Sequence, residues 1–145
     1  MDALVLALMT WIQAASGLPM AEEMPEVRWV APQRMAELAN PNPDPNRDGA
    51  YDRSVTSGYL ALYHADSGTV LLRHDWDAGD LRDRSILLHE LVHHMQASAT
   101  RAYPCAGARE REAYHLQGRW LEERGANLFE LLGMNALFFH AVTRC

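Results

Sequence analysis

Apolar residues recur at helical spacing along residues 2–16. The recurring positions are Leu4, Leu8, Trp11, Ile12 and Ala15. This spacing predicts an amphipathic helix that packs on a core and ends near Gly17. The same stretch resembles a short signal peptide, but it begins with Asp2 instead of a cation, and Gln13 interrupts it. It is too short to span a bilayer as a helix, so we favour a structural N-terminal helix.

Alternating apolar and polar positions predict a small sheet in the first half of the chain. The predicted elements are a strand at 27–30, a helix at 33–39, an irregular Pro/Asn/Asp-rich loop at 40–49, a strand at 56–63, a turn at 65–68 and a strand at 69–73. The last two strands and their turn have the pattern of a β-hairpin.

The second half is predicted to be helical. Asp80 is a plausible N-cap for a helix that runs to about Ser98, and Tyr103-Pro104 interrupts the chain. Further helices are expected at 108–124, ended by Gly125, and at 126–142. This order predicts an α+β fold, with a small antiparallel sheet or hairpin beside a helical bundle. A chain of this length fits a single domain over residues 1–145.

The C-terminal third contains a set of large apolar residues that we expect to be core. They are Trp120, Leu121, Phe129, Leu131, Leu132, Leu137 and Phe138. The last helix is so apolar that a dimer face is an alternative, and the oligomeric state stays open. The tail after Gly125 could also cover a cleft and keep it latent.

The charge balance limits the partners. The chain has 13 Lys+Arg against 19 Asp+Glu, a formal net charge of −6, and all its basic residues are Arg. Nucleic acids and anionic membranes need clustered cations, so neither is an expected partner. No transmembrane span is expected. The two cysteines, Cys105 and Cys145, could form a disulfide in an oxidising, exported or periplasmic location, or stay two thiols in the cytoplasm.

The sequence His89-Glu90-Leu91-Val92-His93 is the strongest chemical signal. Residues four apart stack on one face of a helix, so both imidazoles can bind one cation. Glu90 is rotated by roughly 100° from His89 and can approach a water on the metal without being a ligand. Zinc favours such nitrogen and oxygen ligands, and Glu90 would act as the general base. The spacing is typical of metal-assisted hydrolysis, most often of a peptide bond.

A third ligand is expected on the following helix, in Glu110-Arg111-Glu112-Ala113-Tyr114. Here the chain resembles the gluzincins, zinc peptidases whose third ligand is a Glu from a downstream helix, often opening a Glu-x-x-Ala-Asp or Glu-x-x-Ala-Asn pattern. The resemblance covers about residues 55–125 and implies a zincin-like fold, with Glu110 as the ligand and Glu112 as the alternative. In this division residues 1–50 are an N-terminal helix and loop region, 55–125 the catalytic core and 126–145 a C-terminal helix.

Tyr114 departs from the family pattern, in which an acidic or amide residue there orients a histidine ligand. Asp75, Asp77 and Asp83 are possible substitutes, although Asp83 also suits a helix start. Four further assignments are weaker. His94 is expected at the surface or behind the ligands, His115 and Tyr103 are candidate oxyanion donors, and the strand at 59–63 could form the rim of a cleft that binds substrate by strand addition.

Together these residues predict a zinc-dependent metallopeptidase acting on a peptide or protein substrate. His89, His93 and Glu110 would bind Zn²⁺, and Glu90 would activate water and protonate the leaving amine. One alternative is a non-catalytic zinc-binding domain with a degenerate peptidase fold that acts in binding or scaffolding. Another is metal-dependent hydrolysis of a non-peptide amide.

Overall fold

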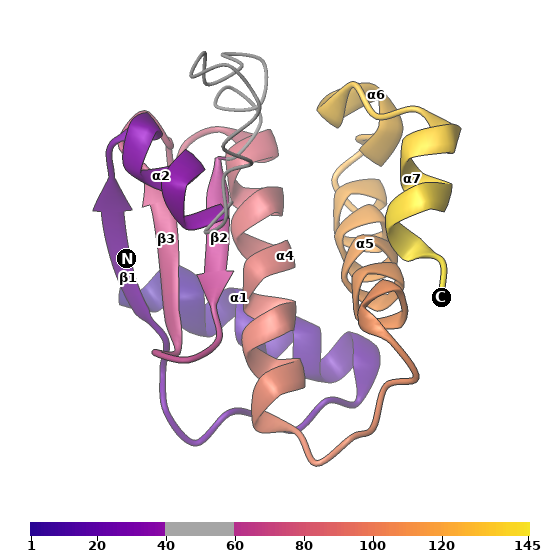
Figure 1. The fold of residues 1–145 in the computed structure, drawn as a ribbon, viewed down its shortest axis with the longest axis horizontal. Helices are drawn as coiled ribbons and strands as arrows, with labels where there is room; N and C mark the ends of the chain where they lie inside the picture. Colours follow the sequence, from indigo (N-terminus) through magenta and orange to yellow (C-terminus); the bar gives the residue numbers. More distant parts are fainter. Residues whose placement is uncertain (40–59) are drawn as a thin grey trace, which may run out of the picture.

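The computed structural model describes residues 1–39 and 60–145. Over these residues, six helices pack with a three-stranded mixed sheet (Figure 1), which confirms the α+β prediction. The elements are α1 (Asp2–Ser16), β1 (Glu26–Val30), α2 (Pro32–Ala39), β2 (Ala61–His64), β3 (Thr69–Arg73), α4 (Leu81–Ser98), α5 (Ala106–Glu122), α6 (Leu128–Leu132) and α7 (Ala136–Thr143). The loop predicted at 40–49 and the start of the strand predicted at 56–63 lie outside the described residues.

The sheet has the order β1-β3-β2. Strands β2 and β3 pair antiparallel from Ala61↔Leu72 to His64↔Thr69, which confirms the hairpin. Strand β1 pairs parallel with β3, so the expectation of an antiparallel sheet was wrong. A parallel pair needs a crossover of a dozen or more residues, and the long segment that includes α2 provides it. Strand β2 is left at the edge of the sheet, beside α4 (Figure 1).

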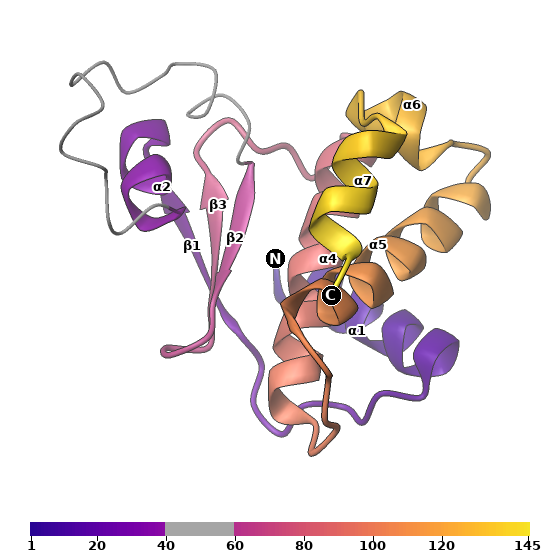
Figure 2. The same ribbon diagram turned by 45° about the vertical axis from the view of Figure 1, so that its right-hand side comes forward.

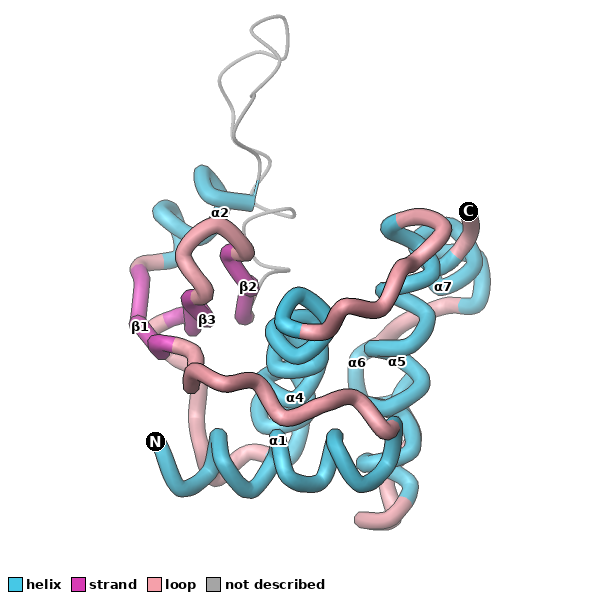
Figure 3. The backbone as a smooth tube through the Cα atoms, turned by 90° about the horizontal axis from the view of Figure 1, so that it is seen from below, coloured by secondary structure: helices cyan, strands magenta, loops and turns pink. Residues whose placement is uncertain are grey.

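Helix α1 confirms the N-terminal helix prediction and packs against α4 and α5. Its buried residues are Val5, Leu8, Met9 and Ile12, and Gly17 ends it in the left-handed conformation, with φ 73°. Figure 3 shows α1 running along one side of α4 and α5. Apolar side chains of α4 and α5, such as Leu88, Leu91 and Trp120, complete the core above it.

Helices α4 and α5 lie side by side and run in opposite directions (Figure 1). The Asp80 carboxylate accepts a hydrogen bond from the Asp83 N–H, which confirms the predicted N-cap, and the helix ends at Ser98 as expected. Asp83 in turn accepts from the Asp77 N–H, as suits a helix-start residue. The antiparallel pair brings the middle of α4 against the first turns of α5.

The tail is not the single helix predicted at 126–142. Gly133, with φ 62°, ends α6, and the Asn135 side chain caps the start of α7. Figure 2 shows both short helices beside α5. The Phe139 ring contacts the rings of Tyr114 and Phe129, with centroids 5.8 and 5.4 Å apart.

The apolar set predicted as core divides in two. Trp120 and Leu121 are buried, and Leu131 and Leu132 pack partly against the core. Phe129, Leu137 and Phe138 are exposed, the last two by 80% and 50%, so their assignment to the core was wrong. Helix α7 is too short to bury more than one face, and the face it buries carries Phe139 and Thr143.

A disulfide between Cys105 and Cys145 joins the chain end to the start of α5. The Arg111 side chain donates to the Thr143 carbonyl at 2.7 Å. A Cβ on Gly107 would lie 2.3 Å from the Arg144 carbonyl oxygen, so only glycine permits this close approach. The bond points to an oxidising compartment.

None of the helices in the described part of the chain is both long enough and apolar enough to cross a membrane.

Candidate metal centre

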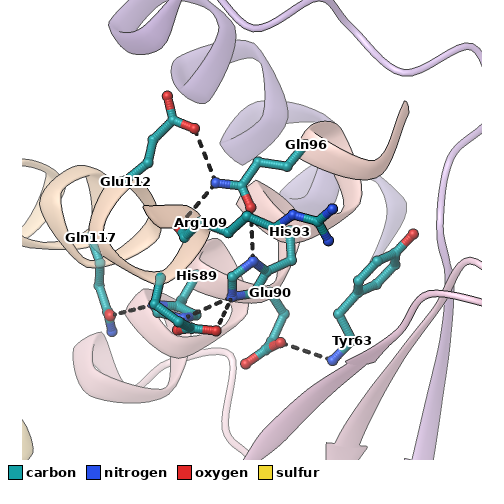
Figure 4. A network of polar contacts seen from close by, with 9 residues as sticks. Tyr63, His89, Glu90, His93, Gln96, Arg109, Glu112 and Gln117 are labelled. Carbon is teal, nitrogen blue, oxygen red and sulfur yellow. Dashed lines mark hydrogen bonds and ion pairs between the residues drawn. The ribbon is translucent and has the colours of Figure 1, made fainter. Parts of the chain in front are cut away.

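His89 and His93 of α4 (Figure 4) converge with Glu110 of α5 at one point. The two Nε2 atoms are 3.1 Å apart. Glu110 places Oε2 at 3.2 Å from His89 Nε2 and Oε1 at 3.2 Å from His93 Nε2. The structure therefore brings together the three side chains that the sequence nominated, two from one helix and one from the next.

This donor set fits a single metal ion. A tetrahedral zinc with bonds of about 2.0–2.1 Å places its ligand atoms roughly 3.3 Å apart, close to the observed separations. Two imidazole nitrogens and one carboxylate oxygen also match the mixed ligands that zinc accepts, and three protein ligands leave a fourth position for water or substrate.

The electrostatics of the group favour positive charge between its ligand atoms. Burial raises the pKa of Glu110, but hydrogen bonds and charges from His89 and His93 outweigh it and hold that pKa well below its usual range. Burial lowers the pKa of His93, but hydrogen bonds to Glu110 and Gln96 and the charges of Glu90 and Glu110 together raise it. The carboxylate is thus ionised and ready to accept a cation.

The other ring nitrogen of His89 faces a buried neutral chain of hydrogen bonds. Gln117 Oε1 lies 3.1 Å from His89 Nδ1, and Gln117 Nε2 donates to Ser85 Oγ at 3.1 Å. The Ser85 hydroxyl donates to the Arg82 carbonyl at 2.7 Å. The serine is therefore an acceptor for Gln117, which fixes the amide so that its oxygen faces His89.

The corresponding nitrogen of His93 faces a second chain that leads to the surface. Gln96 Oε1 lies 2.9 Å from His93 Nδ1. Gln96 Nε2 donates to the Arg109 carbonyl at 3.1 Å and to Glu112 Oε2 at 3.0 Å. Glu112 also accepts from Tyr103 and Arg101, and this environment of burial and a neighbouring carboxylate raises the pKa of Tyr103 to about 12.

The two glutamines set the same tautomer on both histidines. An amide oxygen accepts, so each Nδ1 carries a hydrogen, and each Nε2 presents a lone pair to the centre once its own proton is removed. The sequence reasoning did not find these residues. Gln96 lies three positions after His93 on the same helix, so helical spacing could have nominated it, whereas Gln117 lies on the next helix.

Several weaker candidates lie elsewhere. Glu112 belongs to the Gln96 chain and is not in the ligand group. Tyr114 lies edge-on against the His89 ring, with centroids 4.4 Å apart, and Gln117, three residues later, contacts His89 Nδ1. Asp75 pairs with Arg73 and, like Asp77 and Asp83, does not line the cleft.

The remaining histidine and tyrosine candidates do not reach the centre. His94 is buried, and its ring nitrogens lie 2.9 Å from the Glu23 carbonyl and 3.3 Å from the Tyr63 hydroxyl, so the expectation of a surface or second-layer residue was wrong. His115 is exposed on α5, and Tyr103 donates to Glu112. Neither lines the cleft beside the ligand group.

Glu90 lies between the ligand group and the edge strand of the sheet. Its Oε2 accepts a hydrogen bond from the Tyr63 N–H at 2.8 Å (Figure 4). Backbone groups alternate in direction along a strand, and the Leu60 carbonyl accepts from the Arg73 N–H on the hairpin side. The N–H and C=O groups of Ala61 and Tyr63 consequently face α4.

A cleft of about 850 Å³ encloses this arrangement. Strand β2 forms one wall, α4 and α5 carry the polar floor, and the segment from Leu132 to Phe138 forms an apolar wall opposite. The cleft includes Leu60 to Tyr63, within the strand that the sequence placed at a rim. The fold and site thus define an α+β domain with a possible His-His-Glu metal centre in an open cleft.

Comparison with known families gives one match. Residues 1–131 match a family described as a domain of unknown function, DUF6647. The match covers most of the chain, so the protein belongs to this family. Neither the curated proteins nor the solved structures yield a match to the chain.

Proposed function

We propose that this protein is a zinc metallopeptidase of gluzincin type. His89, His93 and Glu110 hold the zinc, and Glu90 is the general base. The observation that carries the proposal is the placement of the Glu90 carboxylate in the same cleft as the three-ligand group, beside the edge strand β2. The proposal extends to a zincin-like fold and a single domain over residues 1–145.

Zinc held by these residues would polarise a substrate carbonyl and acidify a water molecule. The chain supplies the rest. Glu90 takes the proton from the attacking water and returns it to the leaving amine. Gln117 and Gln96 keep both Nε2 lone pairs directed at the centre. The outward N–H and C=O of Ala61 and the outward C=O of Tyr63 offer main-chain hydrogen bonds to an extended substrate, which favours a peptide over a small amide.

Elemental analysis of the purified protein tests the metal site. We expect one zinc per chain in the parent and in Glu112→Ala, and none in Glu110→Ala. Glu112 is the matched control because it lies on the same helix two positions away and contacts Gln96 instead of the ligand group. Equal zinc in Glu110→Ala and the parent would remove the proposed ligand set.

A peptide library tests the reaction. We expect the zinc-loaded parent to cleave peptide bonds and Glu90→Gln to retain zinc while losing cleavage, because an amide cannot accept the proton. Cleavage at the parental rate by Glu90→Gln would refute the assigned base. Zinc binding without cleavage of any peptide or simple amide would instead favour the non-catalytic binding domain.

A further inference from the structure

Two arginines line the cleft without an ion-pair partner. Arg82 lies in the first turn of α4 and Arg109 in the first turn of α5. Among the described residues, neither is within ion-pair distance of a carboxylate. Arg109 lies one position before Glu110 and three before Glu112. Those carboxylates are directed to the histidines and to Arg101.

Local helix energetics do not explain the position of Arg109. The N-terminal turn of a helix carries partial positive charge, so a guanidinium there is mildly unfavourable for helix stability. The first turn of α5 contains no acidic residue that would offset it. A function in the cleft accounts for the position of Arg109, which helix stability alone disfavours.

Arg109 is held close to the metal centre. Its carbonyl accepts from Gln96 Nε2, and its guanidinium lies 5.8 Å from the centroid of the Tyr103 ring. Figure 4 shows its side chain extending from α5 toward the side of the cleft where Tyr63 lies. Since α4 and α5 run in opposite directions, Arg82 lies toward the other end, about 10 Å along α4 from His89 at 1.5 Å per residue.

The charge of the occupied cleft follows from these positions. A bound dication outweighs the single ligand carboxylate of Glu110, and the two guanidinium groups outweigh Glu90. No other Asp or Glu lines the cleft among the residues that the structure describes. The cleft is then positive in a protein whose formal net charge is −6.

We propose that Arg109 is a specificity-determining residue that binds a carboxylate of the substrate, so that the cleft selects acidic peptides. Resting on the proposed peptidase function, this inference names the substrate class. The planar guanidinium can bind a carboxylate through two parallel hydrogen bonds. That carboxylate belongs either to an Asp or Glu side chain or to the C-terminus of the peptide.

Matched peptides separate the two sources. One pair carries Glu or Gln at each position flanking the cleaved bond, and a second pair ends in a free acid or an amide. Cleavage is followed with the zinc-loaded parent, Arg109→Gln, Arg82→Gln and Arg119→Gln. Arg119 is the control because it lies on α5 outside the cleft.

We expect the parent to prefer one acidic member over its amide by about tenfold in kcat/KM, as for a hydrogen bond to a charged group. Arg109→Gln should abolish the preference, so that the acidic member and its amide are cleaved with equal kcat/KM. Arg82→Gln should reduce it only severalfold, and Arg119→Gln should leave it unchanged. If Arg109 binds a side-chain carboxylate, the preference appears between the Glu and Gln peptides. If it binds the C-terminal carboxylate, the preference appears between the free acid and the amide.

Equilibrium binding tests the selection of acidic peptides separately from the proposed peptidase activity. The same peptides are titrated by calorimetry into zinc-loaded Glu90→Gln, with and without Arg109→Gln. If no peptide is cleaved, the peptidase proposal fails, yet tighter binding of acidic peptides that depends on Arg109 still supports the charge selection. Equal binding and cleavage of acidic and neutral peptides, or a preference that survives Arg109→Gln, overturns it.

Discussion

The two histidines of the candidate centre are supported in different ways. Behind His89, Gln117 and Ser85 are 1% and 0% exposed, and the chain of hydrogen bonds ends on a backbone carbonyl. Behind His93, the chain passes through Gln96 and Glu112 and ends on Arg101, whose side chain is 55% exposed. The support of His89, here the closed side, is neutral and buried. The support of His93, here the open side, is charged and reaches solvent. Both chains orient a histidine ring, but we expect them to respond differently to substitution and to pH.

The largest effect is expected on the closed side. Gln117→Leu leaves the His89 Nδ1–H without a buried acceptor and removes the donor to Ser85 Oγ, at a cost of about 1–3 kcal/mol for an unsatisfied group. Losing the orienting acceptor should also weaken zinc binding about 10–100-fold. Chemical denaturation and competitive zinc titration measure the two changes. An unchanged zinc affinity would show that His89 needs no support from Gln117.

The equivalent change on the open side should cost less. Gln96→Leu removes the acceptor for His93, whose side chain is 16% exposed, so water can partly replace the amide. We expect about tenfold weaker zinc binding, toward the lower end of the range for such partners, and a stability loss of about 1 kcal/mol. If Gln96→Leu proves as costly as Gln117→Leu, the contrast between the two supports is wrong.

A still smaller effect is expected from the charge at the end of the open chain. Glu112→Gln keeps an oxygen that can accept from Gln96 but removes the ion pair with Arg101. Exposed ion pairs contribute about 0–1 kcal/mol, so zinc affinity should fall only severalfold. Ser85→Ala is the matched test on the closed side, where the serine holds the Gln117 amide. Competitive zinc titration of both variants compares the two ends.

The smallest expected effect is a pH dependence of folding stability, which should arise from the open side alone. The pKa of Tyr103 is raised from 10.0 to about 12, first by burial and then by its hydrogen bond to Glu112. The unfolded chain therefore loses this proton at lower pH than the folded protein, and the stability it contributes is lost as pH rises from about 10 to 12. Denaturation at a series of alkaline pH values should show this loss in the parent and less of it in Tyr103→Phe. Identical pH profiles for the parent and Tyr103→Phe would show that Tyr103 does not belong to the hydrogen-bond chain behind His93.

Local patterns made the grouping of His89, His93 and Glu110 predictable, whereas features that depend on tertiary contacts could not be predicted. The spacing of His89 and His93 on one helix face is a local property, and a downstream glutamate in a recognised pattern nominated Glu110. Gln117 could not be assigned to His89 before the antiparallel contact of α4 and α5 was known. The hairpin was predictable from its turn, whereas the parallel pairing of β1 depends on a long connection that carries no local signal.

The tail shows a different limit. Gly133 and Asn135 are ordinary signals for a helix end and a helix start, but the apolar pattern around them favoured one continuous helix. Hydrophobic periodicity also shows that a helix has an apolar face without showing what that face contacts. The partner of α7 is α5, through Phe139 and Tyr114, which leaves Leu137 and Phe138 at the surface.

The disulfide gives the molecule a closed covalent ring. Cys105 and Cys145 are 40 positions apart, and the ring between them contains Glu110 and Gln117, while His89 and His93 lie outside it. A single cut in the segment after α5 would create a new pair of chain ends but no separate fragment. The two pieces would migrate together on a gel until a reductant cleaved the disulfide, and all three candidate ligands would stay in the longer piece.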